Sequence, residues 1–153
     1  MYNIKVISLM NLSKIKSVFV LSITSRMMLE RLTIRNCDEL MHIIVDNGGS
    51  SGSDNIVFPK LKELEVENCG KLEYIFGHID DSNDHQNHNL HLPALKFLKL
   101  RSLPSLTGVC TKNYRTTFPA LAELELIDCS QLDTKSIGDF IVKVLTLLSI
   151  YLH

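Results

Sequence analysis

The residues with the clearest potential for chemistry are three histidines at three-residue spacing, His85, His88 and His91. Three imidazoles can hold zinc, and an aspartate from the same segment could serve as a fourth ligand. A metal site also needs partners that orient each ring. The surrounding segment, HIDDSNDHQNHNLH at residues 78–91, has no apolar periodicity and is expected to be a loop. Such a loop offers no fixed partners for the imidazole rings. We therefore expect no metal site and no cofactor.

Nucleotide chemistry and nucleophilic catalysis are also not indicated. The segment GGSSGS at residues 48–53 lacks the lysine and the strand-to-helix setting of a phosphate-binding loop. No serine, histidine and aspartate share a predicted pocket, because the carboxylates are spread along strand faces that are expected to be exposed. We therefore predict that the chain is not an enzyme.

The composition predicts a protein with one core and no nucleic-acid footprint. The chain has 153 residues, of which 45% are hydrophobic, and a formal net charge of −1. Three of its four cysteines, Cys37, Cys69 and Cys129, occupy one position of a repeat, which favours reduced thiols in the core. The alternative is a disulfide between Cys37 and Cys69 in adjacent coils.

The expected positions of all these residues follow from a repeat in the sequence. The stretch FPKLKELEVENCGKLEYIF at residues 58–76 has a two-residue apolar step from Leu64 to Val66, which is the period of a strand with one buried face. The wider steps that follow suit a chain that turns back in tight or 3₁₀-like segments. The whole stretch follows the leucine-rich-repeat pattern L-x-x-L-x-L-x-x-N/C-x-L.

Five copies of this pattern predict an α/β solenoid over residues 1–133. The copies begin at positions 4, 29, 61, 95 and 121, so the steps are 25, 32, 34 and 26 residues. We expect a leucine-rich-repeat horseshoe segment with a short parallel sheet on its concave face and irregular or 3₁₀ turns on its convex face. The longer steps are explained by insertions at residues 46–55 and 78–91, which we expect to be surface loops outside the core. One parallel sheet should bring together Leu32, Leu64, Leu98 and Leu124.

Two further columns mark the turns of the repeat. Proline follows an apolar residue at Phe58-Pro59, Leu92-Pro93 and Phe118-Pro119. Proline is tolerated just before a strand, and we expect the preceding apolar residue to fill the core on the outer side. A short polar residue suited to a tight turn precedes the cysteine or leucine column, as Asn11, Asn36, Asn68, Ser102 and Asp128.

The residues that alternate with the inward leucines should form the inner face of the solenoid. The candidate protein-binding residues on it are Arg31, Thr33, Arg35, Glu63, Glu65, Glu67, Phe97, Lys99, Arg101, Glu123 and Glu125. In the first interpretation, opposite charges in neighbouring rows pair with one another and serve only the sheet. In the second, they form a surface for a protein partner, with Phe97 as its aromatic anchor.

The pattern changes to helical spacing after residue 136. We predict a helical tail at residues 134–153, with apolar positions at Ile137, Phe140, Ile141, Val144, Leu145, Leu148 and Leu152, that covers the end of the solenoid. A membrane anchor is the alternative, and Asp139 and Lys143 argue against it. No comparable cover precedes the first repeat, so we expect the chain to be a piece of a longer protein.

Three of the repeats, FPKLKELEVENCGKLEYIF, LPALKFLKLRSLPSLTGVC and FPALAELELIDCSQL, resemble the C-terminal leucine-rich repeats of plant coiled-coil nucleotide-binding (NBS-LRR) disease-resistance proteins. The resemblance spans residues 4–132. It is carried by the combination of a Phe/Leu-Pro start with a cysteine turn, and the G-x-I-P signature of extracellular plant receptors is absent.

The resemblance implies a cytoplasmic, non-enzymatic recognition module. Its partner would be a pathogen effector, a host protein altered by one, or the nucleotide-binding domain of the same receptor, which it would help to keep inactive. No nucleic-acid or membrane partner is implied. The coiled coil and the nucleotide-binding switch are missing from this sequence, so recognition is expected and switching is not.

A second resemblance gives the alternative function. The segment LELIDCSQLDTKSIGDF at residues 124–140 is also similar to the cysteine-containing repeats of F-box ubiquitin ligases. The chain would then be a substrate-binding solenoid of that class, or a free-standing scaffold.

Overall fold

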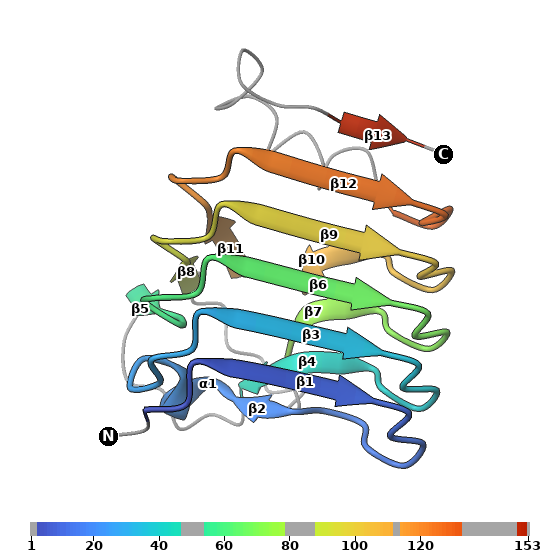
Figure 1. Ribbon diagram of the computed structural model, residues 1–153, viewed down its shortest axis with the longest axis horizontal. Helices are drawn as coiled ribbons and strands as arrows, with labels where there is room; N and C mark the ends of the chain where they lie inside the picture. Colours follow the sequence, from blue (N-terminus) through green and yellow to red (C-terminus); the bar gives the residue numbers. More distant parts are fainter. Residues whose placement is uncertain (1–2, 47–53, 79–87, 112–113, 133–149, 153) are drawn as a thin grey trace.

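Six parallel strands stacked along the molecule form its main sheet, which we call the ladder sheet (Figure 1). The computed structural model describes residues 3–46, 54–78, 88–111, 114–132 and 150–152. In spatial order the strands of the ladder sheet are β1 (Val6–Met10), β3 (Arg31–Arg35), β6 (Glu63–Glu67), β9 (Phe97–Arg101), β12 (Glu123–Ile127) and β13 (Ile150–Leu152).

The register of the ladder sheet confirms the prediction made from the repeat. Leu32 pairs with Leu64, Leu64 with Leu98, and Leu98 with Leu124. These leucines and the residues two positions after them are buried, whereas the residues between them reach the surface. Each buried leucine contributes about 1.5–3 kcal/mol by leaving water, so a slip of one residue would remove this contribution along a whole strand.

Two smaller parallel sheets line the returning part of the coils. The second sheet consists, in spatial order, of β10 (Gly108–Cys110), β7 (Tyr74–His78), β4 (His42–Asp46) and β2 (Phe19–Val20). The third sheet consists of β11 (Tyr114–Thr117), β8 (His88–His91) and β5 (Asp54–Ile56). We expected 3₁₀ turns here, but the described residues contain none, because the returning segments pair with their equivalents in the next coil.

Helical structure is limited to one turn in the described part of the chain. Helix α1 (Leu21–Thr24) has 4 residues and follows β2 directly. No helix among the described residues has the length and apolar character needed to cross a membrane.

The short polar column bends the chain at the ends of β1, β3, β6, β9 and β12. Asn36 and Asn68 have φ angles of 56° and 54°, and the other three members of the column are also left-handed. Asparagine, aspartate and serine suit this bend because their short side chains are tolerated in or near that region. The N–H of Asn36 donates to the carbonyl of Glu67 in the next coil at 3.0–3.1 Å, as that of Asn68 does to Arg101. The bend thus continues the hydrogen bonding of the ladder sheet.

The cysteine column is a row of thiols directed at the strand ends. Cys37, Cys69 and Cys129 each donate to the carbonyl two residues earlier at 3.4–3.5 Å. All of the cysteines are free, which confirms the prediction of reduced thiols and excludes the Cys37–Cys69 bridge from this structure. The thiol is small enough to be buried and still offers one donor to the turn.

The proline column lies in β-turns that deliver the next leucine to the core. The N–H of Leu61 donates to the carbonyl of Phe58, and Leu121 donates to Phe118 in the same way, so proline occupies the second position of each turn. Phe58 is buried and packs edge-on against Phe19, with ring centroids 5.1 Å apart. Leu92 is also buried and Phe118 is half-buried, so the expected filling of the core is complete at two of three positions.

The prediction that residues 46–55 and 78–91 are surface loops was wrong at their ends. His88–His91 form β8, in which Leu90 is 1% exposed and His88 is 8% exposed. Asp46 ends β4 and is also buried. Strand pairing with β5 and β11 gives this polar segment a buried side, which a search for apolar spacing does not detect. Residues 47–53 and 79–87 lie outside the described part of the chain.

The predicted C-terminal helix at residues 134–153 falls mostly on residues that the structure does not describe, namely 134–149 and 153. Leu152, the last position of its helical spacing, lies instead in β13 and pairs with Leu126 of β12. The proposed boundary between residues 133 and 134 lies among the undescribed residues.

The close approach of β7 to β4 leads to a prediction about Gly77. A Cβ at this buried position would overlap the ring of His42, whereas one at Gly70 would meet open space. We expect Gly77→Ala to lower the free energy of unfolding by about 1–3 kcal/mol. The control Gly70→Ala should change it by less than about 0.5 kcal/mol. Urea denaturation measures both, and equal effects would mean that His42 moves aside without cost.

The cysteine column leads to a prediction about pH. Burial raises the pKa of the Cys69 thiol from 9.0 to about 11. A raised folded-state pKa contributes stability that is complete below the unfolded-state pKa and is lost as the pH rises toward the folded-state value. We expect the free energy of unfolding to fall between pH 9 and pH 11, by at most about 1.4 kcal/mol per pH unit from this group.

The comparison that isolates the thiol is Cys69→Ala. Other groups titrate in the same window in both proteins, so urea denaturation of the variant should show a shallower decline with pH. Parallel curves would contradict the assignment.

Candidate protein-binding face

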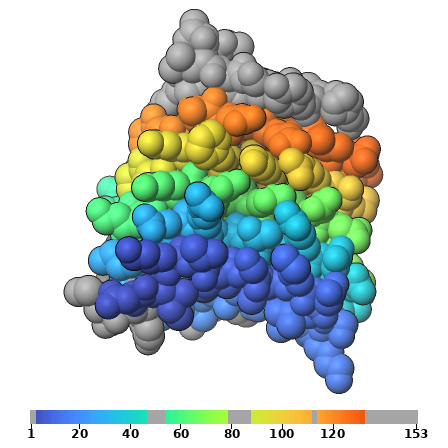
Figure 2. Space-filling view, viewed as in Figure 1, coloured from blue at the N-terminus to red at the C-terminus, as the bar shows by residue number. Residues whose placement is uncertain are grey.

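The outward side chains of β1, β3, β6, β9 and β12 form one continuous face, which we call the ladder face (Figure 2). All of the predicted binding residues lie on it, in three columns set by the strand register. The first column is Arg31, Glu63, Phe97 and Glu123, the second is Thr33, Glu65, Lys99 and Glu125, and the third is Arg35, Glu67, Arg101 and Ile127. Neighbouring rows are about 4.8 Å apart, so each charged side chain reaches the rows on both sides.

Glu65 is the centre of the charge network on the ladder face. Its Oε1 lies 3.0 Å from Arg35 Nη2 and 3.3 Å from Arg101 Nη1, and its side chain is 13% exposed. Both arginines come from the third column, one row on each side of Glu65. The contacts therefore run diagonally and link β3, β6 and β9.

Arg101 makes the best-directed pair of the network, with Glu125. Its Nε and Nη2 donate to the two carboxylate oxygens at 3.0 and 2.9 Å, which is a bidentate arrangement. This hydrogen bond and the charge of Arg101 lower the pKa of Glu125, although partial burial opposes the shift. The same bond raises the pKa of Arg101. Both groups therefore stay charged at neutral pH, and the pair ties β9 to β12.

Glu63 and Glu67 are paired as well. Glu63 lies 3.2 Å from Lys99 Nζ and 4.0 Å from Arg31 Nε, and Glu67 lies 3.5 Å from Arg35 Nε. The alternation of basic and acidic rows thus produces ion pairs between neighbouring strands, as the first interpretation of the sequence predicted. For these residues the charges serve the sheet.

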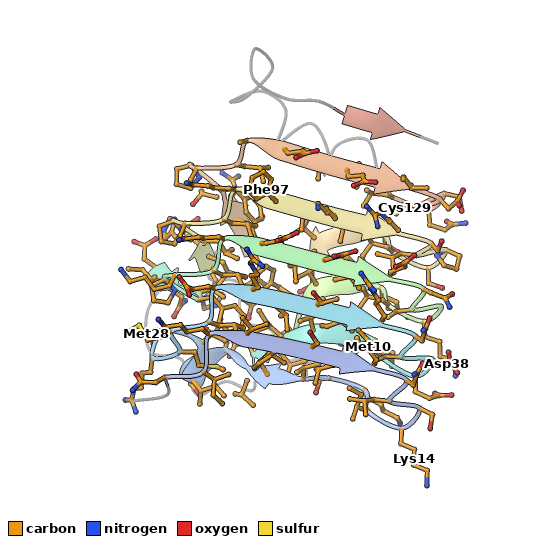
Figure 3. The ribbon with its side chains drawn as sticks, viewed as in Figure 1. Met10, Lys14, Met28, Asp38, Phe97 and Cys129 are labelled. Atoms are coloured by element: carbon orange, nitrogen blue, oxygen red, sulfur yellow. The ribbon has the colours of Figure 1, made fainter. Side chains whose placement is uncertain are left out.

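The remaining side chains of the face are those that the network does not use. Phe97, the first residue of β9, is 37% exposed, and Figure 3 shows it on this face of the stack. Glu123, its neighbour on β12, has no ion pair among the described residues. At the opposite end of the face, Val6 and Met10 of β1 are exposed apolar side chains. In the register Val6 lies opposite Arg31 and Met10 opposite Arg35, while Thr33 lies opposite Ser8.

The histidines considered for zinc binding have separate surroundings. His85 lies outside the described residues. His88 stacks on Tyr114 with ring centroids 4.9 Å apart, while the ring of His91 approaches Thr117 and Asp54. No group of three or more metal-ligating side chains is found among the residues that the structure describes.

One polar chain on the third sheet has the order of a catalytic triad. His91 Nδ1 lies 2.6 Å from Thr117 Oγ1, and His91 Nε2 lies 3.3 Å from Asp54 Oδ1. Asp54 also accepts from Asn89, which helps to lower its pKa, and its side chain is largely exposed. Because the participating residues belong to neighbouring strands β5, β8 and β11, we interpret these side-chain contacts as a polar link between coils. Sequence reasoning missed it because the third sheet was not predicted.

A second polar contact joins the second and third sheets. The hydroxyl of Tyr114 on β11 donates to Asp46 Oδ2 on β4 at 2.7 Å, across 68 positions of sequence. The ring of His78 also contacts Tyr114, with centroids 5.9 Å apart. No sequence signal pairs these residues, because they come from non-equivalent positions of different coils.

Comparison with known proteins gives a match over the repeat region of the chain. Residues 28–137 match the family described as plant disease resistance protein RPS2-like, leucine-rich repeats. A disease resistance protein of Arabidopsis thaliana is 32% identical over 78 residues, which are 51% of this chain and 7% of that protein. The chain thus corresponds to a small part of a much longer relative. No solved structure matches the chain significantly.

The bidentate pair leads to a prediction for a double-mutant cycle. Arg101→Met and Glu125→Gln should show a coupling of about 1 kcal/mol, near the upper end for ion pairs that are not deeply buried. The control is the pair Lys71–Glu39, which has one contact at 2.9 Å between more exposed side chains and should couple less. Urea denaturation of each set of variants gives the couplings. Equal values for the two pairs would show that the bidentate geometry adds nothing.

Proposed function

This chain belongs to the plant disease resistance protein RPS2-like leucine-rich-repeat family, and on that premise we propose that its ladder face is a protein-recognition surface of an immune receptor. Solenoids present extended faces of this kind to their partners. We further propose that the stack curves as a horseshoe with the ladder face on the concave side, and that the module acts in the cytoplasm without enzymatic activity.

The single observation that carries the proposal is the exposure of Phe97. An aromatic side chain that is 37% exposed on a sheet face contributes little to the core, and its neighbours on the face are mostly held in ion pairs. Aromatic residues at the centre of an interface are frequent anchors of binding energy. Phe97 lies on β9, an interior strand of the ladder sheet.

The proposed partner is a protein of one of three kinds. It is a pathogen effector, a host protein that an effector has altered, or the nucleotide-binding domain of the same receptor, whose inactive state the contact would favour. The family match supports these partners over those of an F-box ubiquitin ligase or a free scaffold.

The ion-pair network changes which substitutions test this function. Glu65→Arg would place a third cation between Arg35 and Arg101, so it would destabilise the sheet as well as alter the face. Phe97→Ala removes an exposed ring without breaking an ion pair. Ile56→Ala is a matched control, because Ile56 is an exposed apolar residue of β5 on another sheet.

We expect Phe97→Ala to weaken partner binding about 10- to 30-fold and Ile56→Ala to leave it unchanged. The immobilised chain would be exposed to extracts of healthy and infected leaves. Proteins retained in a Phe97-dependent way would be purified and their affinities measured by calorimetry, with melting temperatures recorded for each variant. The proposal fails if every retained protein binds both variants and the native chain equally.

A further inference from the structure

The charges of the ladder face balance except at the first residue of β12. Its cations are Arg31, Arg35, Lys99 and Arg101, and each lies within 4.0 Å of a carboxylate. Its carboxylates are Glu63, Glu65, Glu67, Glu123 and Glu125, and within the described residues Glu123 alone lacks an ion pair. One negative charge therefore remains for an external partner, and it is located at the start of β12.

Glu123 is the register partner of Phe97, the residue that carries the exposed aromatic ring of the face. In the register of the ladder sheet Phe97 pairs with Glu63 on one side and with Glu123 on the other. Glu63 is already occupied by Lys99 and Arg31. The phenyl ring is thus flanked by one neutralised and one unneutralised carboxylate.

From this juxtaposition we infer that Phe97 and Glu123 form a site for a single cationic side chain of the partner protein, with arginine preferred. The inference rests on the proposed function and specifies the chemistry of its partner. A guanidinium stacked on the phenyl face gains a cation–π interaction, and its N–H groups can reach the adjacent carboxylate. An ammonium group offers a point charge without the planar stacking surface, so lysine binds less tightly.

The rest of the face sets the environment of this site. A basic partner gains little from Glu65 or Glu125, because their oxygens already accept hydrogen bonds from arginines of the sheet. Displacing Arg101 from Glu125 would break a bidentate pair. The neutralised part of the face therefore serves as a rim, and the attraction for a cation is concentrated at Phe97 and Glu123.

A peptide titration tests the site without knowledge of the natural partner. The probe is the capped peptide Gly-Gly-Arg-Gly-Gly, and its control carries citrulline, which has the shape of arginine without the charge. The full chain, labelled with ¹⁵N, is titrated with each peptide and followed by NMR. We expect the arginine peptide to bind with a Kd of about 1–10 mM and to shift the amides of Phe97 and Glu123. The citrulline peptide should cause no such shifts.

Matched variants separate the two contacts. Phe97→Leu keeps an apolar side chain but removes the aromatic ring, and Glu123→Gln keeps the shape but removes the charge. Each should weaken binding of the arginine peptide about tenfold, as expected for the loss of one partly exposed cation–π or charge-assisted contact. Glu67→Gln, a change to a paired carboxylate of the same face, should leave binding unchanged.

The outcomes distinguish this inference from the proposed function. Equal shifts with the arginine and citrulline peptides, shifts centred on Glu65, or no binding up to tens of millimolar would each overturn the cation site. If Phe97→Ala still weakened partner capture in that case, the recognition function would stand. If the arginine peptide bound as expected but partner capture did not depend on Phe97, the site would stand and its role in recognition would fall.

Discussion

Backbone pairing between successive coils is the constraint on which the rest of this structure depends. The interior ladder strands satisfy their N–H and C=O groups with the strands of neighbouring coils, because a backbone polar group left unpaired within the sheet costs about as much as a lost hydrogen bond. The left-handed residues after β1, β3, β6 and β9 each extend that pairing by one hydrogen bond, as Asn36 does with Glu67. The coil therefore turns without interrupting the sheet, and Asn68 Nδ2 adds a side-chain bond to Asn36 Oδ1 at 2.7 Å.

This pairing also determines what the charged residues of the face do. Parallel, in-register strands bring each row of side chains within reach of the next, so a basic row beside an acidic row forms ion pairs between coils. Arg101 uses this geometry diagonally and contacts both Glu65 and Glu125. Most of the charged side chains of the ladder face are paired with one another within the sheet. Recognition consequently depends on the few side chains that the sheet leaves over.

The returning segments show the same constraint acting on a less regular sequence. β5, β8 and β11 contain asparagine, histidine and threonine at positions that face their neighbours, and polar contacts between these strands add to the apolar packing of Leu90. His91 contacts both Thr117 and Asp54, and Tyr114 reaches Asp46. Polar segments can join a solenoid when backbone pairing brings their side chains close enough to hydrogen-bond one another.

The sequence by itself determined the repeat, the register of the leucines and the set of residues on the ladder face. These follow from local periodicity, because Leu64 and Val66 must share one side of a strand and Glu65 the other. The tertiary structure alone decided which partner each charge takes, that His88 and Leu90 are buried, and that Leu152 lies in a strand. Those outcomes depend on which residues of other coils lie opposite, and these partners are 24 or more positions apart in the sequence. A local sequence pattern contains no information about contacts over such separations.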